Sequence, residues 1–357
     1  MDYLLTIPSS FILLISLINF LTIRTPDKTS QIQESISVVV PLRNEANNVG
    51  ELVASLRDQE NLTQVEFLLL DDNSEDDTLA LLQQHVSGLS NFHVLSGTTL
   101  PQGWIGKTWA LQQLLERSTG EIIISIDADV RLTSDAISKS VTLLKNAQLD
   151  FLSPYPKQLA LSWSERLIQP LLQWSWMSTV ILRVAEKSSL SSTVVANGQF
   201  FVVRKAALDQ VGGYDSVRNK VLDDVELARS LVKNGSHGCV ANGAAIASTR
   251  MYSSWTEIKA GYGKSLHAAF GSVLGSAIAI TFLFLTGIAP LIAGITGSSI
   301  GWYAFAAVTL TRAMSAIKVG KTGLDAFLHP LSSALLIYLI IYSWMMRGQV
   351  QWKGRTL

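Results

Sequence analysis

Charged residues and cysteine are both scarce in this sequence. Asp, Glu, Lys and Arg make up only 16% of the 357 residues, whereas a soluble domain carries roughly 25%. Part of the chain is therefore expected to meet lipid. The single cysteine, Cys239, excludes an intramolecular disulfide and a cysteine-based metal cage, and it is most simply a small buried apolar residue. The formal net charge of zero argues against nucleic acid as the main partner.

The first long segment without charge lies near the N-terminus. Tyr3–Ile23 is long enough to cross a bilayer, which takes about 20 residues. Its start is acidic (Asp2), and Arg24 and Lys28 follow it, unlike the charge order of a cleaved signal peptide. Basic residues favour the cytoplasmic side. We therefore predict an uncleaved anchor over 1–25 in a plasma membrane, with the following domain in the cytoplasm.

A second apolar region occupies 266–348, before a basic tail at 349–357. Its three candidate membrane segments are Ala268–Ser299, Ile300–Ile317 and Leu328–Met346. If all three span, the basic tail lies outside, against the usual charge preference. If the first of them, which carries Gly287 and Pro290 near its middle, is a re-entrant hairpin, the tail returns to the cytoplasm. We favour the hairpin.

Between these regions, 34–265 is expected to form one catalytic domain that includes a Trp-rich helix at 163–184. Trp163, Trp174 and Trp176 would suit a helix lying at the membrane surface, because indole rings favour the headgroup region. An ordinary helix facing a protein core explains the same pattern equally well.

The domain pattern alternates strands with helices. The expected buried strands are Ile36–Pro41, Phe67–Asp71, His93–Ser96 and Ile122–Ile126, and the expected helices are Asn47–Gln59, Thr78–Val86 and Thr108–Arg117. This alternation predicts an α/β fold with a mostly parallel, Rossmann-like sheet. Ligands on such sheets bind beyond the carboxyl ends of the strands.

Acidic and polar residues follow three of these strands. They lie in Val40-Pro41-Leu42-Arg43-Asn44-Glu45, Leu70-Asp71-Asp72-Asn73-Ser74 and Ser125-Ile126-Asp127-Ala128-Asp129. Two carboxylates one residue apart can share a hard cation such as Mg²⁺ or Mn²⁺, with substrate phosphates and water as further ligands. Each motif alone could be turn or capping chemistry. Three in successive units indicate a binding site.

These motifs together resemble glycosyltransferase family 2, which has the GT-A fold. The likeness includes Leu222-Asp223-Asp224-Val225-Glu226-Leu227-Ala228. It extends to the membrane-bound branch of hopene-associated and carotenoid glycosyltransferases through Pro101-Gln102-Gly103-Trp104-Ile105-Gly106-Lys107, Thr249-Arg250-Met251-Tyr252 and Trp352-Lys353-Gly354-Arg355. The similarity runs from about residue 36 to the C-terminus. The ordered set of motifs is specific, whereas each one alone is not.

The resemblance implies roles for single residues toward a nucleotide-sugar donor. Asp72 would contact the base or ribose, and Asp127 and Asp129 would bind ribose and the metal–diphosphate, with Mg²⁺ or Mn²⁺ as cofactor. Asp224 would be the general base that accepts the proton of the acceptor hydroxyl, in a single inverting displacement. Asp223 would be a helix cap or an orienting partner. The alternative for Asp224 is a carboxylate that merely stabilises a helix N-terminus.

Further residues join this expected site with open alternatives. Pro41, Arg43 and Glu45 belong to the donor side, and Lys107 would meet a phosphate or remain solvated. Arg250, or Lys264, could supply positive charge beside the diphosphate. The family's acceptor-side loop corresponds to Asn197-Gly198-Gln199, where glycine could allow close approach of the backbone or simply make a turn.

One departure from the family bears on the product. Processive members carry Gln-x-x-Arg-Trp after the catalytic acid, and Met251-Tyr252-Ser253-Ser254-Trp255 lacks both Gln and Arg. This favours transfer of one sugar. The resemblance implies a UDP-linked donor, and the resemblance together with the apolar C-terminal region favours a lipid hydroxyl as acceptor. A polyprenyl phosphate acceptor is the alternative within enzymes. A transporter or scaffold is disfavoured, because the membrane segments offer few polar groups besides Arg312 and His329.

Overall fold

The structure is a computed structural model that describes residues 2–347, 351–352 and 355–356. It divides into two compact units, which are described separately. The α/β unit comprises Arg24–Lys157 and Val184–Thr249, and the helical unit comprises Met1–Ile23, Gln158–Arg183 and Arg250–Leu357. The Trp-rich segment, up to Arg183, therefore falls in the same unit as the apolar helices. The predicted boundaries had placed it within the domain 34–265 instead of with the region 266–348.

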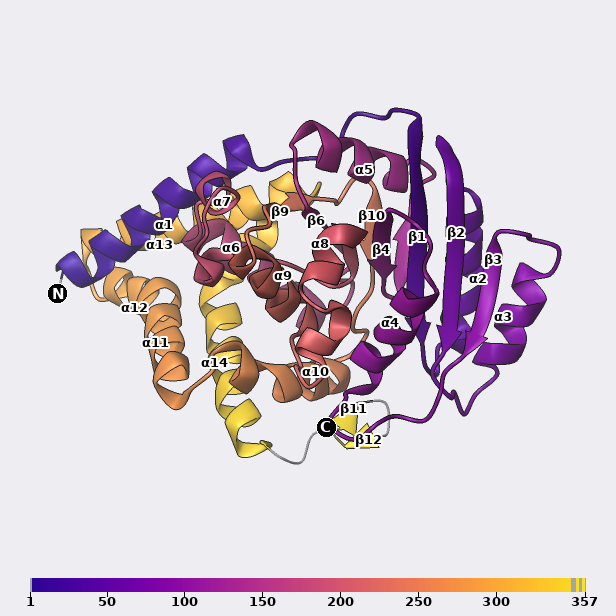
Figure 1. Cartoon of the computed structure of the whole chain (residues 1–357). Coiled ribbons are helices and arrows are strands. Elements are labelled where there is room, and N and C mark those ends of the chain that lie inside the picture. The colour runs from indigo at the N-terminus through magenta and orange to yellow at the C-terminus, as the bar shows by residue number, and fades with distance from the viewer. Residues whose placement is uncertain (1, 348–350, 353–354, 357) are drawn as a thin grey trace. The chain divides into compact units, whose positions relative to one another are not determined.

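A seven-stranded sheet forms the centre of the α/β unit (Figure 1), in the order β3-β2-β1-β4-β8-β6-β9. Its strands are β1 (Ile32–Leu42), β2 (Leu62–Asp71), β3 (Phe92–Ser96), β4 (Ile122–Ile126), β6 (Phe151–Tyr155), β8 (Phe200–Arg204) and β9 (Gly238–Asn242). The first four pair in parallel, β8 runs antiparallel between β4 and β6, and β6 pairs in parallel with β9. The expected α/β fold with a mostly parallel sheet is confirmed.

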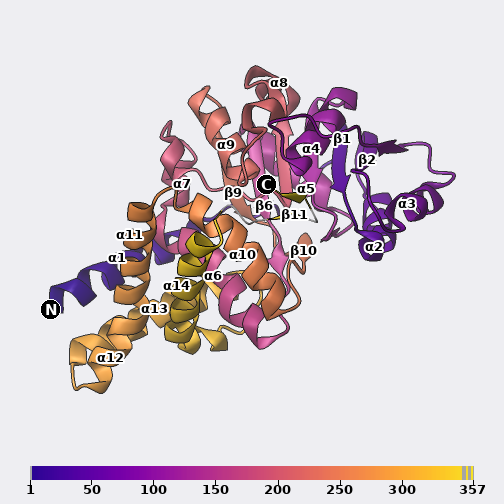
Figure 2. The same ribbon diagram turned by 90° about the horizontal axis from the view of Figure 1, so that it is seen from below.

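Helices cover both faces of this sheet. They are α2 (Ala46–Arg57), α3 (Thr78–Val86), α4 (Gly106–Arg117), α5 (Ala136–Asn146), α8 (Lys205–Gln210) and α9 (Asp223–Lys233). One apolar core joins α2, α3 and α5 to the sheet, and a second joins α4, α8 and α9 to it. Figure 2 shows α2 and α4 on opposite sides of β1 and β2.

The period of two residues along a strand explains why both faces are apolar. Val38 and Val40 of β1 enter the core with α2, whereas Val39 between them enters the core with α4. A strand buried on both faces is a continuous apolar run. The four predicted strands were of this kind, and all four are present, together with the three predicted helices between them.

Strand register brings the polar strand ends to one edge. Leu42 of β1 pairs with Asp71 of β2, and Val39 pairs with Ser125 of β4. Beyond β4 the chain forms β5 (Val130–Leu132), which pairs antiparallel with β10 (Ala247–Thr249). The residues after β1, β2 and β4 therefore lie at the same carboxyl edge of the sheet.

The helical unit is built around a separate apolar core. Its helices are α1 (Asp2–Thr22), α6 (Trp163–Thr179), α10 (Trp255–Ala269), α11 (Val273–Leu283), α12 (Ala289–Ile295), α13 (Ser299–Lys318) and α14 (His329–Met345). In the described part of the chain, three helical segments are long and apolar enough to cross a membrane: Tyr3–Thr22, Val273–Ile295 and Leu324–Met345. Two short elements, β7 (Lys157–Gln158) and α7 (Leu182–Ala185), lie across the boundaries of the units.

The re-entrant hairpin favoured for Ala268–Ser299 is wrong. The π-helical turn Phe284–Ile288 joins α11 to α12, so the chain is helical from Val273 to Ile295 without a reversal. Pro290 sits in the first turn of α12, where its missing N–H costs little because a π-turn already interrupts the ladder. The predicted segment Ile300–Ile317 is helical as part of α13, but it is not among the three apolar enough to span.

Helix α6 faces the core of the helical unit. Trp174 and Trp176 are buried, whereas Trp163 is 65% exposed. The core-facing alternative therefore describes most of this helix, and a position at the membrane surface stays a prediction. Of the predicted basic tail 349–357, the structure shows the paired strands β11 (Gln351–Trp352) and β12 (Arg355–Thr356). The rest of it, including Lys353, lies outside the described residues.

Candidate active site

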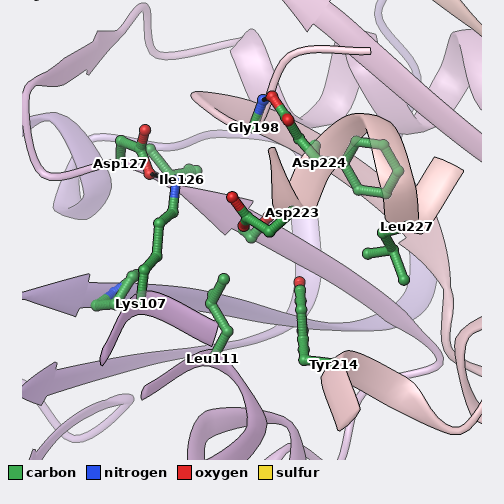
Figure 3. A pocket seen from close by; sticks show the side chains of 12 residues that line it. Lys107, Leu111, Ile126, Asp127, Gly198, Tyr214, Asp223, Asp224 and Leu227 are labelled. Atoms are coloured by element: carbon green, nitrogen blue, oxygen red, sulfur yellow. Dashed lines mark hydrogen bonds and ion pairs between the residues drawn. The ribbon is translucent and has the colours of Figure 1, made fainter. Parts of the chain in front are cut away.

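A small pocket opens at the carboxyl edge of the sheet, and charged side chains from three elements meet in it (Figure 3). Its lining comprises Pro41, Lys107, Leu111, Ser125, Ile126, Asp127, Gly198, Phe201, Tyr214, Asp223, Asp224 and Leu227. These residues come from β1, α4, β4, β8 and α9 and from the loops beside them. Six of the residues expected from the sequence share this pocket: Pro41, Lys107, Asp127, Gly198, Asp223 and Asp224.

Lys107 is the cation of the pocket. It lies in the first turn of α4, and its Nζ is 2.7 Å from Oδ1 of Asp127. Asp127, Asp223 and Asp224 all raise its pKa against the opposing effect of burial, so the ammonium stays charged. The Lys107 ammonium therefore lies among carboxylates in the pocket and is not a solvated surface lysine.

Asp223 and Asp224 open helix α9. Burial raises the pKa of Asp223 to about 6 and also raises the pKa of Asp224, while the Lys107 ammonium opposes both shifts. Figure 3 shows Asp224 turned toward Gly198 and Asp223 turned toward the middle of the pocket. Both carboxylates therefore have an increased proton affinity, which is the direction of shift that suits a general base near neutral pH.

Both carboxylate oxygens of Asp224 are fixed by backbone donors. Gly198 N–H donates to Oδ2 at 2.7 Å, and Val225 N–H donates to Oδ1 at 2.8 Å. Each oxygen retains a second lone pair. The carboxylate is thus held in one orientation without losing its capacity to accept a proton.

Asp129 lies two residues beyond Asp127, in the turn between β4 and β5. Its Oδ2 accepts a hydrogen bond of 2.8 Å from Thr249 Oγ1. Burial, and then the charge of Asp127, raise the pKa of Asp129 to about 6, with a further contribution from Glu45. Neighbouring carboxylates that destabilise each other's charge suit a divalent cation, which would relieve that repulsion.

The donor set also fits Mg²⁺ or Mn²⁺. No group of three or more His, Cys, Asp or Glu side chains is gathered for a metal within the described residues. These two ions commonly take only one or two protein carboxylates and complete their shell with phosphate oxygens and water. Asp129 and Asp127 are the residues that could supply those ligands.

The side chain of Arg43 is buried and binds neighbouring residues of the protein instead of pointing into an open site. Its Nη1 donates hydrogen bonds of 2.7 Å to the carbonyl oxygens of Asp72 and Asn73. Its Nη2 lies 3.2 Å from Glu75 Oε1. The guanidinium therefore braces the turn after β2, and Asp72, itself buried, is positioned by it.

Glu45 lies between β1 and α2, at the same carboxyl edge of the sheet. Its N–H donates to Thr78 Oγ1 at 2.8 Å, and its Oε2 accepts a hydrogen bond of 2.6 Å from Asn48 Nδ2. Its charge raises the pKa of Asp129, so it lies near Asp129 at this edge.

The segment Asn197-Gly198-Gln199 connects the pocket to the sheet. Asn197 Oδ1 accepts from Gln199 N–H at 2.9 Å, and the Gln199 carbonyl accepts from Asp127 N–H at 3.1 Å. A Cβ on Gly198 would lie 3.1 Å from Asp224 Cβ. This glycine therefore does permit the close approach of backbone and acid, whichever ligand the loop meets.

Arg250 belongs to the helical unit. Its Nη2 is 3.0 Å from Oε1 of Glu165, whose side chain is fully buried. Part of its charge is thus balanced within that unit, and its expected role beside a diphosphate stays a prediction.

Sequence reasoning missed the pocket residues Tyr214, Leu111, Phe201 and Leu227. Tyr214 follows Gly212 and Gly213, which both have positive φ, of 82° and 65°. A pair of glycines before an aromatic residue was the available signal, because paired left-handed positions mark a specific backbone turn.

The fold and the acidic edge place the α/β unit in the GT-A class of glycosyltransferase domains. A mannosyltransferase from Pyrobaculum calidifontis, solved in complex with GDP-Man and Mn²⁺, superposes with a TM-score of 0.57 at 14% identity, over 94% of this chain and 98% of that one. At this identity the likeness concerns the fold alone. Residues 37–212 match the model of glycosyl transferase family 2. The chain thus carries a glycosyltransferase family 2 domain, as its motifs predicted.

Curated relatives agree with this family. A beta-monoglucosyldiacylglycerol synthase from Trichormus variabilis is 29% identical over 54% of this chain and 40% of the synthase. A 4,4'-diaponeurosporenoate glycosyltransferase from Staphylococcus aureus is 24% identical over 90% of this chain and 88% of that enzyme. The chain therefore matches less than half of the synthase but nearly all of the diaponeurosporenoate enzyme.

Proposed function

We propose that this protein is a membrane-bound, inverting and metal-dependent glycosyltransferase. It moves one sugar from a nucleotide diphosphate, UDP-linked by preference, to the hydroxyl of a lipid. The α/β unit acts in the cytoplasm at the membrane surface, and the apolar helices hold it there.

The observation that carries this proposal is the meeting of Lys107 with three carboxylates in one pocket. The Lys107 ammonium lies against Asp127, and its charge partly offsets the rise that burial causes in the pKa of Asp223 and of Asp224. Such a pocket can hold an anionic leaving group on its cationic side and a proton acceptor on the other, which is the charge distribution that sugar transfer from a diphosphate needs.

The chain's own residues divide the reaction between them. Asp224, held by two backbone N–H groups, accepts the proton of the acceptor hydroxyl as its oxygen attacks the anomeric carbon. Lys107 stabilises negative charge on the diphosphate as the sugar–phosphate bond breaks. Asp72, positioned by Arg43, binds the base or ribose. A divalent ion held by Asp129 and Asp127 would neutralise part of the diphosphate charge.

A lipid acceptor is supported by the helical unit and by the relatives' names. Three segments of the described part of the chain could lie in a bilayer. A lipid with a hydroxyl group could then reach a site at the membrane surface without leaving the bilayer. The named relatives include a monoglucosyldiacylglycerol synthase and a diaponeurosporenoate glycosyltransferase. The sequence 251–255, which lacks the Gln-x-x-Arg-Trp motif, favours a single transfer.

The full-length protein, purified in detergent, tests this proposal. It is incubated with Mn²⁺ or Mg²⁺, a panel of UDP- and GDP-sugars and a lipid extract, and the products are identified by mass spectrometry. We expect a lipid carrying one added hexose with an inverted anomeric centre. Absence of transfer from every donor would refute the proposal.

The variant Asp224→Asn distinguishes the two acceptor classes. A hydroxyl acceptor needs a general base, so the variant should lose nearly all activity, as expected for loss of a positioned base that contributes about 10²- to 10⁴-fold. A modest loss would instead indicate a phosphate acceptor, because a phosphate oxygen is already ionised.

A further inference from the structure

Tyr214 occupies a specially built position at the pocket. It follows Gly212 and Gly213, which both have left-handed φ values, and it lies in the 3₁₀ helix Gly213–Val217. A Cβ on Gly213 would lie 2.8 Å from Leu115 Cδ2 and 3.0 Å from Gln112 Oε1. The Tyr214 N–H also donates to Gln112 Oε1 at 3.1 Å. Backbone and helix α4 therefore fix this side chain in one place.

No hydrogen bond of good geometry satisfies the buried phenol oxygen of Tyr214 within the described residues, although the Ser125 side chain lies near enough to lower the pKa of the phenol. The side chain as a whole is only 2% exposed and packs in the core shared with α4 and α9. Figure 3 shows the hydroxyl pointing up into the pocket, below Asp223. Burial raises the pKa of the phenol to about 12, so the group is a neutral donor at physiological pH. A buried hydroxyl without a partner costs stability, and Phe would fill the same space without that cost.

The surroundings of Tyr214 define what it could bind. Lys107 and Asp127 mark the charged side of the pocket, and Leu111 and Leu227 line the side next to the phenol. Phosphate would be repelled there, because Asp223 is the neighbouring acid. A sugar ring has apolar C–H faces and hydroxyl groups that both donate and accept, which matches apolar walls with a few fixed polar groups.

We propose that the Tyr214 hydroxyl donates a hydrogen bond to a hydroxyl oxygen of the donor's sugar and thereby helps to select the sugar. This inference rests on the proposed function, and it assigns the sugar, rather than the nucleotide, to this end of the pocket. Asp223 can accept a hydrogen bond from a sugar hydroxyl beside it.

The test is Tyr214→Phe in the full-length protein, with three measurements. These are the thermal midpoint Tm without ligand, the KM for the sugar nucleotide that the wild type uses, and the inhibition constant of the free nucleoside diphosphate. We expect an unchanged or higher Tm, a KM raised about tenfold or more, as for a site that loses its partner for a substrate hydroxyl, and an unchanged inhibition constant.

Deoxy-sugar donors identify the hydroxyl that Tyr214 binds. In the wild type, one deoxy analogue should lose as much kcat/KM as Tyr214→Phe loses with the natural sugar, and the variant should lose nothing more with that analogue. Tyr303→Phe is the matched control. Its hydroxyl lies 2.8 Å from Ser10 Oγ in the helical unit, and its removal should leave the donor KM unchanged.

Two other outcomes would overturn the inference while leaving the proposed function intact. One is a wild-type KM in the Tyr214→Phe variant, and the other is an equal weakening of nucleoside diphosphate binding. A lowered Tm would show that the hydroxyl serves the fold and would overturn it as well. If the wild type itself neither binds nor uses any sugar nucleotide, the proposed function and this inference both fall.

Discussion

The backbone N–H of Gly198 donates a hydrogen bond of 2.7 Å to Oδ2 of Asp224. The donor lies just before β8 and the acceptor at the start of α9, so the bond ties the expected acceptor loop to the expected base. The bond can be this short because residue 198 is a glycine. A Cβ at this position would lie only 3.1 Å from Asp224 Cβ.

Gly198→Ala should therefore reduce catalysis more than stability. The added methyl displaces Asp224 by a few tenths of an ångström, and a displacement near 1 Å can cost about 10²-fold in rate. We expect a fall in kcat of about tenfold, with the donor KM nearly unchanged, in a steady-state assay. Gly50→Ala is the matched control, because its Cβ would meet His85 at an ordinary 3.4 Å. Equal activity of the two variants would contradict a role for the contact.

The pH dependence of transfer should have an acid limb with an apparent pKa near 6. Asp223 has a pKa raised to about 6 and that of Asp224 is also raised, so protons bind to the pair as the pH falls through this range and remove the base. The apparent pKa belongs to the pair, because the two carboxylates interact. A profile of kcat/KM against pH with no fall between pH 7 and pH 5 would argue against this pair as the base.

Lys107→Met should move that acid limb to higher pH. The ammonium favours the ionised forms of Asp223 and Asp224, so its loss raises the pKa of the pair further. The proposed role of Lys107 beside the diphosphate predicts that the rate falls at every pH too, but the shift of the limb is a separate observable. An unmoved limb would show that the lysine does not act on the pair.

Much of this site could be predicted from sequence, because each piece is local. The acids after β1, β2 and β4 follow continuous apolar runs, and parallel strands necessarily bring their carboxyl ends to one edge. The ion pair between Lys107 and Asp127 was beyond reach, because it depends on how α4 packs against the sheet. Tyr214 was missed for the same reason: it enters the pocket from a turn far along the chain, and only packing brings it there.

The helical unit was harder to predict because apolarity alone does not specify a path. Gly287 and Pro290 suggested a reversal, yet a π-turn accommodates both within one helical run. The Trp-rich segment had the composition of a surface helix, but Trp174 is buried and its Nε1 donates to Thr311 Oγ1 at 2.8 Å. Trp174 can be buried in the core because its indole N–H has a buried hydrogen-bond partner there.

Removal of the divalent ion should abolish transfer and donor hydrolysis together. Asp129→Ala should have the same effect, since Asp129 and Asp127 are the carboxylates available to the ion. We expect a loss of at least about 10²-fold in both activities, comparable to the loss of one strong electrostatic group in an active site. Activity that survives both EDTA and the substitution would contradict a metal site. Asp58→Asn, at an exposed ion pair with Arg57, is the control for a change of charge elsewhere.

Arg312 should stabilise the helical unit by compensating for Pro170. Proline at position 170 of α6 has no N–H for the carbonyl of Arg166 four residues earlier. The buried Arg312 supplies donors instead: its Nη2 lies 3.5 Å from the Arg166 carbonyl oxygen and 3.3 Å from that of Leu167. Arg312→Met should therefore lower stability by about 1.5 to 3 kcal/mol, the range for hydrogen bonds to a charged group.

A double-mutant cycle separates this role from a general effect of burying Arg312. Pro170→Ala returns the missing N–H to α6, so Arg312→Met should cost less in that background than in the wild type. Thermal or denaturant unfolding of the four proteins in the same detergent measures the difference. Equal costs in both backgrounds would show that the guanidinium does not serve the proline. In that case the buried charge of Arg312 would need a different explanation, because a buried charge without a partner is costly.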